Sequence, residues 1–75
     1  MFSKRRIQFR ILEYLRLKGG SATDRDLYEM LRKEFDISYS QLLNMLMSME
    51  IEGFISIRAS REVKLIVLKK YRSTA

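Results

Sequence analysis

The spacing of apolar residues changes period at Gly53, and this change constrains the fold more than any other feature of the sequence. Between residues 4 and 53, apolar side chains recur three or four positions apart, which is the period of an amphipathic helix. After Gly53 they alternate or form a short β-branched run, which is typical of strands. We therefore expect helices followed by a β-hairpin.

Three helices are predicted before Gly53, over residues 4–18, 24–34 and 39–52. Each has one apolar stripe that faces inward, and polar side chains cover the rest of its surface. The inward residues are Ile7, Ile11, Tyr14 and Leu15 in the first helix, Leu27, Met30 and Leu31 in the second, and Leu42, Met45, Leu46 and Met49 in the third.

Capping residues support these helix boundaries. Thr23 is the expected N-cap of the second helix, and Asp26 makes a variant of the capping box. Ser38 and Gln41 form a full Ser-x-x-Gln capping box for the third helix. Glycines follow the first and third helices, where a left-handed residue commonly ends a helix.

The C-terminal part predicts two strands, over residues 54–58 and 63–68. The whole chain, 1–75, is expected to form one domain with its core over about 4–68 and a basic tail over 69–75. Its length allows only a modest core. The predicted class is mainly α with a small β-hairpin (α+β), with residues 21–22 as an extended link.

Composition argues against catalysis. The chain has no cysteine and no histidine, so thiolate chemistry, disulfides and the commonest general base are absent. It has three glycines and no Gly-rich phosphate loop. We therefore expect no enzyme, cofactor or metal site. The lack of cysteine fits a cytoplasmic protein, which is the expected location. No apolar run approaches the ~20 residues that span a bilayer, so we expect no membrane partner.

The sequence resembles the winged helix-turn-helix superfamily. The matching pattern is Ile37-Ser38-x-x-x-Leu42-x-x-x-Leu46-x-x-Met49-x-x-x-Gly53-Phe54-Ile55, preceded by Ala22-Thr23-x-x-x-Leu27. The resemblance implies three helices plus a two-stranded wing, with the third helix as the recognition helix in the DNA major groove. It implies that the groove-facing residues are Ser38, Tyr39, Ser40, Gln41, Leu43, Asn44, Met47 and Ser48.

Charge is unevenly distributed along the chain. Residues 1–23 carry a net charge of +5, residues 24–52 carry −4 and residues 53–75 carry +5. The recognition helix has no Lys or Arg, so phosphate contacts must come from the flanking segments. The candidates are Lys4, Arg5, Arg6 and Arg10 at the start, Arg58, Arg61 and Lys64 in the wing, and Lys69, Lys70 and Arg72 in the tail.

Several apolar residues do not fit the core stripes. Leu43, Met47 and Ile51 are out of phase with the inward stripe of the third helix, which suggests a partner contact, although the hairpin or first helix could cover some of them. The run from Leu65 to Leu68 is expected to be covered on both faces.

Two hypotheses follow for the function. The first is a DNA-binding transcriptional regulator, expected to be dimeric, that uses the polar recognition helix with basic wing and termini on double-stranded DNA. The second is a protein-interaction winged helix that serves as an accessory subunit of a larger assembly and binds its partner through the off-phase residues.

Overall fold

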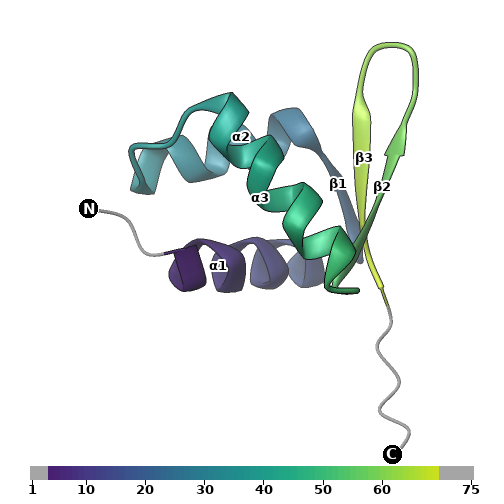
Figure 1. Cartoon of the computed structure of the whole chain (residues 1–75), viewed down its shortest axis with the longest axis horizontal. Helices are drawn as coiled ribbons and strands as arrows, with labels where there is room; N and C mark the ends of the chain where they lie inside the picture. Colours follow the sequence, from purple (N-terminus) through teal and green to yellow (C-terminus); the bar gives the residue numbers. More distant parts are fainter. Residues whose placement is uncertain (1–3, 70–75) are drawn as a thin grey trace, which may run out of the picture.

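Three helices and three strands make up the fold of the computed structural model, which describes residues 4–69 (Figure 1). In chain order they are α1 (Lys4–Leu17), β1 (Ser21–Thr23), α2 (Asp24–Glu34), α3 (Tyr39–Ile51), β2 (Ile55–Ala59) and β3 (Lys64–Leu68). The protein is thus a small α+β domain, and the predicted helices are confirmed. The tail residues Lys70 and Arg72 lie outside the described part of the chain.

The predicted helix caps are present. The Thr23 hydroxyl accepts a hydrogen bond from the Asp26 backbone N–H at 3.1 Å. At α3, the Ser38 hydroxyl accepts from the Gln41 N–H at 3.1 Å, and Gln41 Oε1 accepts from the Ser38 N–H at 2.8 Å. Gly53 has a φ of 90° and follows the end of α3, as expected for a left-handed stop.

The strands form one antiparallel sheet in the order β1-β3-β2, so the sheet has three strands instead of the predicted two. Residues 21–22, predicted as an extended link, belong to β1, where Ala22 pairs with Ile66. Ile66 also pairs with Ile57 of β2. A segment of three residues is too short to show alternation, and its pairing partner lies at the far end of the chain.

The core lies where the three helix stripes meet the sheet. Its fully buried side chains are Ile7, Ile11, Leu15, Leu27, Leu31, Leu42, Leu46, Met49, Ile55 and Ile66. The predicted inward residues are confirmed, except that Tyr14 and Met30 are half-buried and pack against the edge of this core.

The expectation that the run in β3 is covered on both faces is wrong. Ile66 is fully buried, but Leu65 is exposed and Val67 is half-buried. Figure 1 shows the three helices on one side of the sheet, so alternate residues of β3 face away from them.

Candidate nucleic-acid interface

The outward face of α3 carries small polar side chains near its N-terminal end. Ser40, Gln41 and Asn44 are exposed, while the stripe that includes Leu42 and Met45 is buried. α3 has no basic residue in its last turn and no Lys or Arg elsewhere in its sequence. This face therefore offers hydrogen-bonding groups that suit base edges, but no positive charge for phosphates.

Some of the predicted groove-facing residues already have partners in the fold. Ser38 and Gln41 bond each other's backbone in the capping box. Tyr39 is hydrogen-bonded to α2, and Ser48 is half-buried. The polar groups that remain fully outward are the side chains of Ser40 and Asn44 and the amide nitrogen of Gln41.

Asp24 links the starts of α2, α3 and β3. Its carboxylate accepts a hydrogen bond from the Tyr39 hydroxyl and another, at 3.3 Å, from the backbone N–H of Lys64. Burial is the largest single influence on the pKa of Asp24, and it raises that pKa. Hydrogen bonds from the Tyr39 hydroxyl and from the backbone N–H groups of Lys64 and Arg25 together outweigh it, so the pKa is lowered. The bond to Asp24 raises the pKa of Tyr39. This carboxylate fixes the N-terminal end of α3 beside the hairpin.

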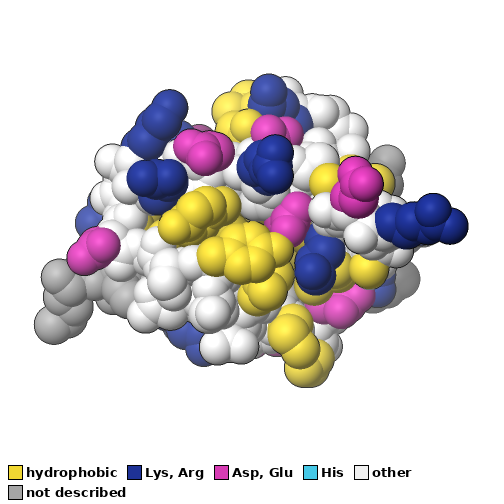
Figure 2. Space-filling view, turned by 90° about the horizontal axis from the view of Figure 1, so that it is seen from above, with side chains coloured by type: hydrophobic (Ala, Val, Ile, Leu, Met, Phe, Trp, Pro, Cys, Tyr) yellow, Lys and Arg dark blue, Asp and Glu magenta, His cyan; other side chains and the backbone are white. Residues whose placement is uncertain are grey.

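The surface around Asp24 carries charges of both signs. Seen from the side of the β2–β3 turn, hydrophobic side chains gather in the middle, with Lys, Arg, Asp and Glu around them (Figure 2). Tyr28 and Tyr39 pack edge to face with ring centroids 5.8 Å apart. Together with Arg25, Glu29 and the hairpin residue Glu62, they line a hollow of about 280 Å³. Basic residues therefore border this face without covering it.

Lys4, at the start of α1, lies beside α3. It lines a hollow of about 230 Å³ together with Gln41, Asn44 and Met45. Arg5 and Arg6 line a different groove, on the outer side of α1. Arg10 lines that groove as well, so the four predicted basic residues at the start of the chain are divided between two surfaces.

The hairpin contacts the C-terminal end of α3. Glu50 of α3 accepts a hydrogen bond from the backbone N–H of Ile57 at 2.9 Å, so this carboxylate is engaged with β2. Arg58 and Arg61 are exposed, and Lys64 is half-buried. Arg58 pairs with Leu65, so it lies on the sheet face that points away from the helices, and Arg61 lies in the exposed turn between β2 and β3.

Two of the three predicted partner-binding residues, Met47 and Ile51, lie uncovered. Met47 is 55% exposed and Ile51 is 86% exposed, while Leu43 is half-buried. They recur every four positions, so they follow one side of α3. Neither the hairpin nor α1 covers Met47 or Ile51.

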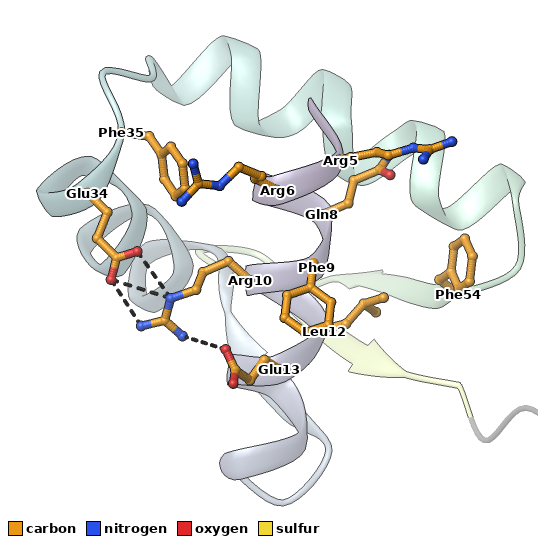
Figure 3. A pocket seen from close by; sticks show the side chains of 10 residues that line it. All are labelled: Arg5, Arg6, Gln8, Phe9, Arg10, Leu12, Glu13, Glu34, Phe35 and Phe54. Atoms are coloured by element: carbon orange, nitrogen blue, oxygen red, sulfur yellow. Dashed lines mark hydrogen bonds and ion pairs between the residues drawn. The ribbon is translucent and has the colours of Figure 1, made fainter. Parts of the chain in front are cut away.

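An apolar groove on α1 was not predicted from the sequence. Phe9 is 67% exposed and lines this groove with Leu12 and Phe54, which come from α1 and the segment after α3 (Figure 3). The groove has a volume of about 540 Å³ on the side of Glu34 and Phe35. Phe9 is out of phase with the core stripe of α1, and this spacing is the feature of the sequence that indicates an outward-facing apolar residue.

Ion pairs close one end of this groove. The Arg10 guanidinium donates to Glu34 at 3.1 Å and to Glu13 at 3.3 Å (Figure 3). The hydrogen bond to Glu34 raises the pKa of Arg10, and the same bond lowers the pKa of Glu34. Arg10 therefore has a structural partner, whereas the sequence suggested a phosphate contact.

Among residues 4–69, no group of three or more His, Cys, Asp or Glu side chains could hold a metal ion. Within the same range, no helix is long and apolar enough to cross a membrane. Comparison with protein-family models, curated protein sequences and solved structures gives no match for this chain. The exposed side chains described above are therefore the basis for a functional assignment.

Proposed function

We propose that this protein is a winged helix-turn-helix domain that binds double-stranded DNA, with α3 in the major groove and the β2–β3 hairpin as the wing. The capped α2–α3 pair followed by a hairpin supports this assignment. A role in transcription regulation is the corresponding cellular function.

The proposal rests on basic residues at the start of α1 and in the hairpin. Lys4 lies beside Gln41 and Asn44. The hairpin carries two further exposed arginines, Arg58 on the outer face of β2 and Arg61 in the turn before β3. Affinity for DNA generally depends largely on phosphate neutralisation, and these basic residues would supply the charge that α3 lacks.

The outward polar groups of α3 suit base recognition. An Asn or Gln amide can pair with the N6 and N7 positions of adenine, and a Ser hydroxyl can bond either a base or a phosphate. Asn44 and Ser40 are exposed on the turn that would enter the groove. Because Gln41 Oε1 is held in the capping box, Asn44 has the freer amide for direct readout.

A panel of variants tests this assignment by fluorescence anisotropy with a labelled duplex of mixed sequence. We expect Lys4→Ala to weaken binding, and the double variant Arg58→Ala/Arg61→Ala to weaken it more. Lys33→Ala is the matched control, because Lys33 is an exposed basic residue on α2, outside the proposed surface. Equal losses of duplex affinity in Lys33→Ala and in the hairpin variant would indicate nonspecific charge attraction instead of binding through the proposed surface.

A protein-binding role for α3 is the second candidate, and the exposure of Met47 and Ile51 favours it. Large apolar side chains on an uncovered helix face are typical of interaction surfaces. Met47→Asp is expected to leave the fold intact, since the side chain is outside the core. Loss of self-association or of a protein partner in this variant, with duplex binding unchanged, would favour the second candidate.

A further inference from the structure

The apolar groove on α1 continues past Phe9 to the end of β3. On one side of Phe9 it is bordered by Glu34 and Phe35, and on the other by Leu68 and Lys69. Both halves share Phe9, Leu12 and Phe54, and each half has a volume of about 540 Å³. The two halves therefore form one surface across the outer side of α1.

The centre of this surface is apolar and exposed. Phe54 is 45% exposed, and Phe9 still more so. Both side chains border the open space in Figure 3, Phe9 from α1 and Phe54 from the segment before β2. A single exposed apolar residue needs no explanation, but two phenylalanines and two leucines around one groove are typical of a binding site.

The margins of the groove are basic. Arg5 and Arg16 stand on the same side of α1 as Phe9 and Leu12, and Lys69 borders the groove at the end of β3. Within residues 4–69, no ion pair engages Arg5, Arg16 or Lys69. Of the acidic residues in the lining, Glu13 and Glu34 are both paired with Arg10. The available charge around the groove is therefore positive.

We propose that this groove binds an acidic amphipathic helix of a partner protein. The apolar face of such a helix would cover Phe9, Leu12 and Phe54, and its carboxylates would reach Arg5, Arg16 and Lys69. Arg5 and Arg16 are 11 positions apart, about 16 Å along α1, which corresponds to three turns of a partner helix. This is the helix-in-groove mode of recognition, with basic margins that select for acidic flanks.

The charge of the groove favours an acidic helix over two other occupants, a second copy of this chain and a DNA backbone. A second copy packed on the same groove would bring its own Arg5, Arg16 and Lys69 against these residues, and like charges would oppose the contact. A DNA backbone would meet phenylalanine and leucine side chains between the charged margins, where it needs hydrogen-bond donors and cations.

Two designed peptides provide the direct test. The first is a fluorescein-labelled amphipathic helix with leucines along one face and glutamates on both flanks, and the second has lysine at each glutamate position. We expect micromolar binding of the glutamate peptide and at least tenfold weaker binding of the lysine peptide. Binding of neither peptide, or equal binding of both, would overturn the proposal.

Substitutions locate the binding on the groove. Phe9→Ala is expected to lower the affinity for the glutamate peptide at least tenfold. Leu17→Ala removes an exposed leucine of α1 outside the groove, and it is expected to change this affinity less than twofold. Arg16→Glu is expected to lower the affinity for the glutamate peptide and to raise the affinity for the lysine peptide. Circular dichroism verifies that each variant is folded, and an unchanged affinity in folded Phe9→Ala would refute the assignment.

Other occupants give different outcomes. If sedimentation shows a dimer that becomes a monomer in Phe9→Ala, a second copy covers the groove instead. If Phe9→Ala weakens duplex binding as much as the hairpin variant does, the groove belongs to the DNA-binding surface. Either of these results would overturn the proposal of an acidic partner.

Discussion

The hydroxyl of Tyr39, the first residue of α3, donates a hydrogen bond to the carboxylate of Asp24, the first residue of α2. The other oxygen of Asp24 accepts from the backbone N–H of Lys64, the first residue of β3. One nearly buried carboxylate therefore ties together the starts of the two helices and of the last strand. The position of α3 relative to the hairpin depends on this carboxylate.

Tyr39→Phe is expected to destabilise the domain by about 1–2 kcal/mol, because it removes a hydrogen bond to a charged group and keeps the ring. The edge-to-face contact of this ring with Tyr28 should survive. Chemical denaturation of the two proteins at neutral pH measures the difference in unfolding free energy. Equal midpoints with equal slopes would show that the bond adds nothing to stability.

The lowered pKa of Asp24 makes stability depend on pH in the acidic range. Its folded pKa lies below the unfolded value of about 4, so its contribution is present above that pH and is lost as pH falls through the folded pKa. Tyr39→Phe removes one bond that lowers this pKa. We therefore expect the wild-type Tm to fall more steeply than the variant's between about pH 5 and about pH 3. Parallel Tm curves would contradict this role of Asp24.

Leu46 and Met47 are neighbours on α3 with opposite environments. Leu46 is fully buried in the core, whereas Met47 is mostly exposed. Leu46→Ala is expected to cost about 2–5 kcal/mol, and Met47→Ala about 0.5 kcal/mol or less. Urea denaturation of both variants measures the change in the free energy of unfolding. A loss above roughly 1 kcal/mol in Met47→Ala, about twice the usual surface effect, would place this residue in the core.

Gly53 ends α3 with a φ of 90°, and a Cβ built at this position would meet no atom within 4 Å. Gly53→Ala should therefore destabilise through backbone strain alone, by about 1–2 kcal/mol. Thermal unfolding compares the variant with the wild type. A variant as stable as the wild type would indicate that the chain leaves α3 by another backbone path at no cost.

The helices were predictable because their signals are local. Thr23 and Ser38 lie next to the helices that they cap, and the core stripe of α3 follows from spacing within one helix. β1 was missed because its only signal is pairing with β3, a contact between distant segments such as Ala22 and Ile66. Strand assignment from sequence depends on alternation, which three residues cannot display.

The candidate sites were predictable only in part. The exposure of Met47 follows from its phase in α3, and the same reasoning applied to Phe9 indicates an outward residue on α1. The groove itself needs Phe54 and Leu68, which are brought to α1 by the fold. The division of Lys4 and Arg5 between two surfaces depends on side-chain direction, which the net charge of the segment does not specify.

The salt dependence of duplex binding tests the central claim most directly. Anisotropy titrations of the wild-type protein with a labelled mixed-sequence duplex, repeated over a range of salt concentrations, give log K against log salt. If Lys4, Arg58 and Arg61 each neutralise a phosphate, affinity should fall with a slope of about −2 to −3, close to −0.9 per contact. No binding at low salt, or binding that does not change with salt, would contradict a DNA-binding function.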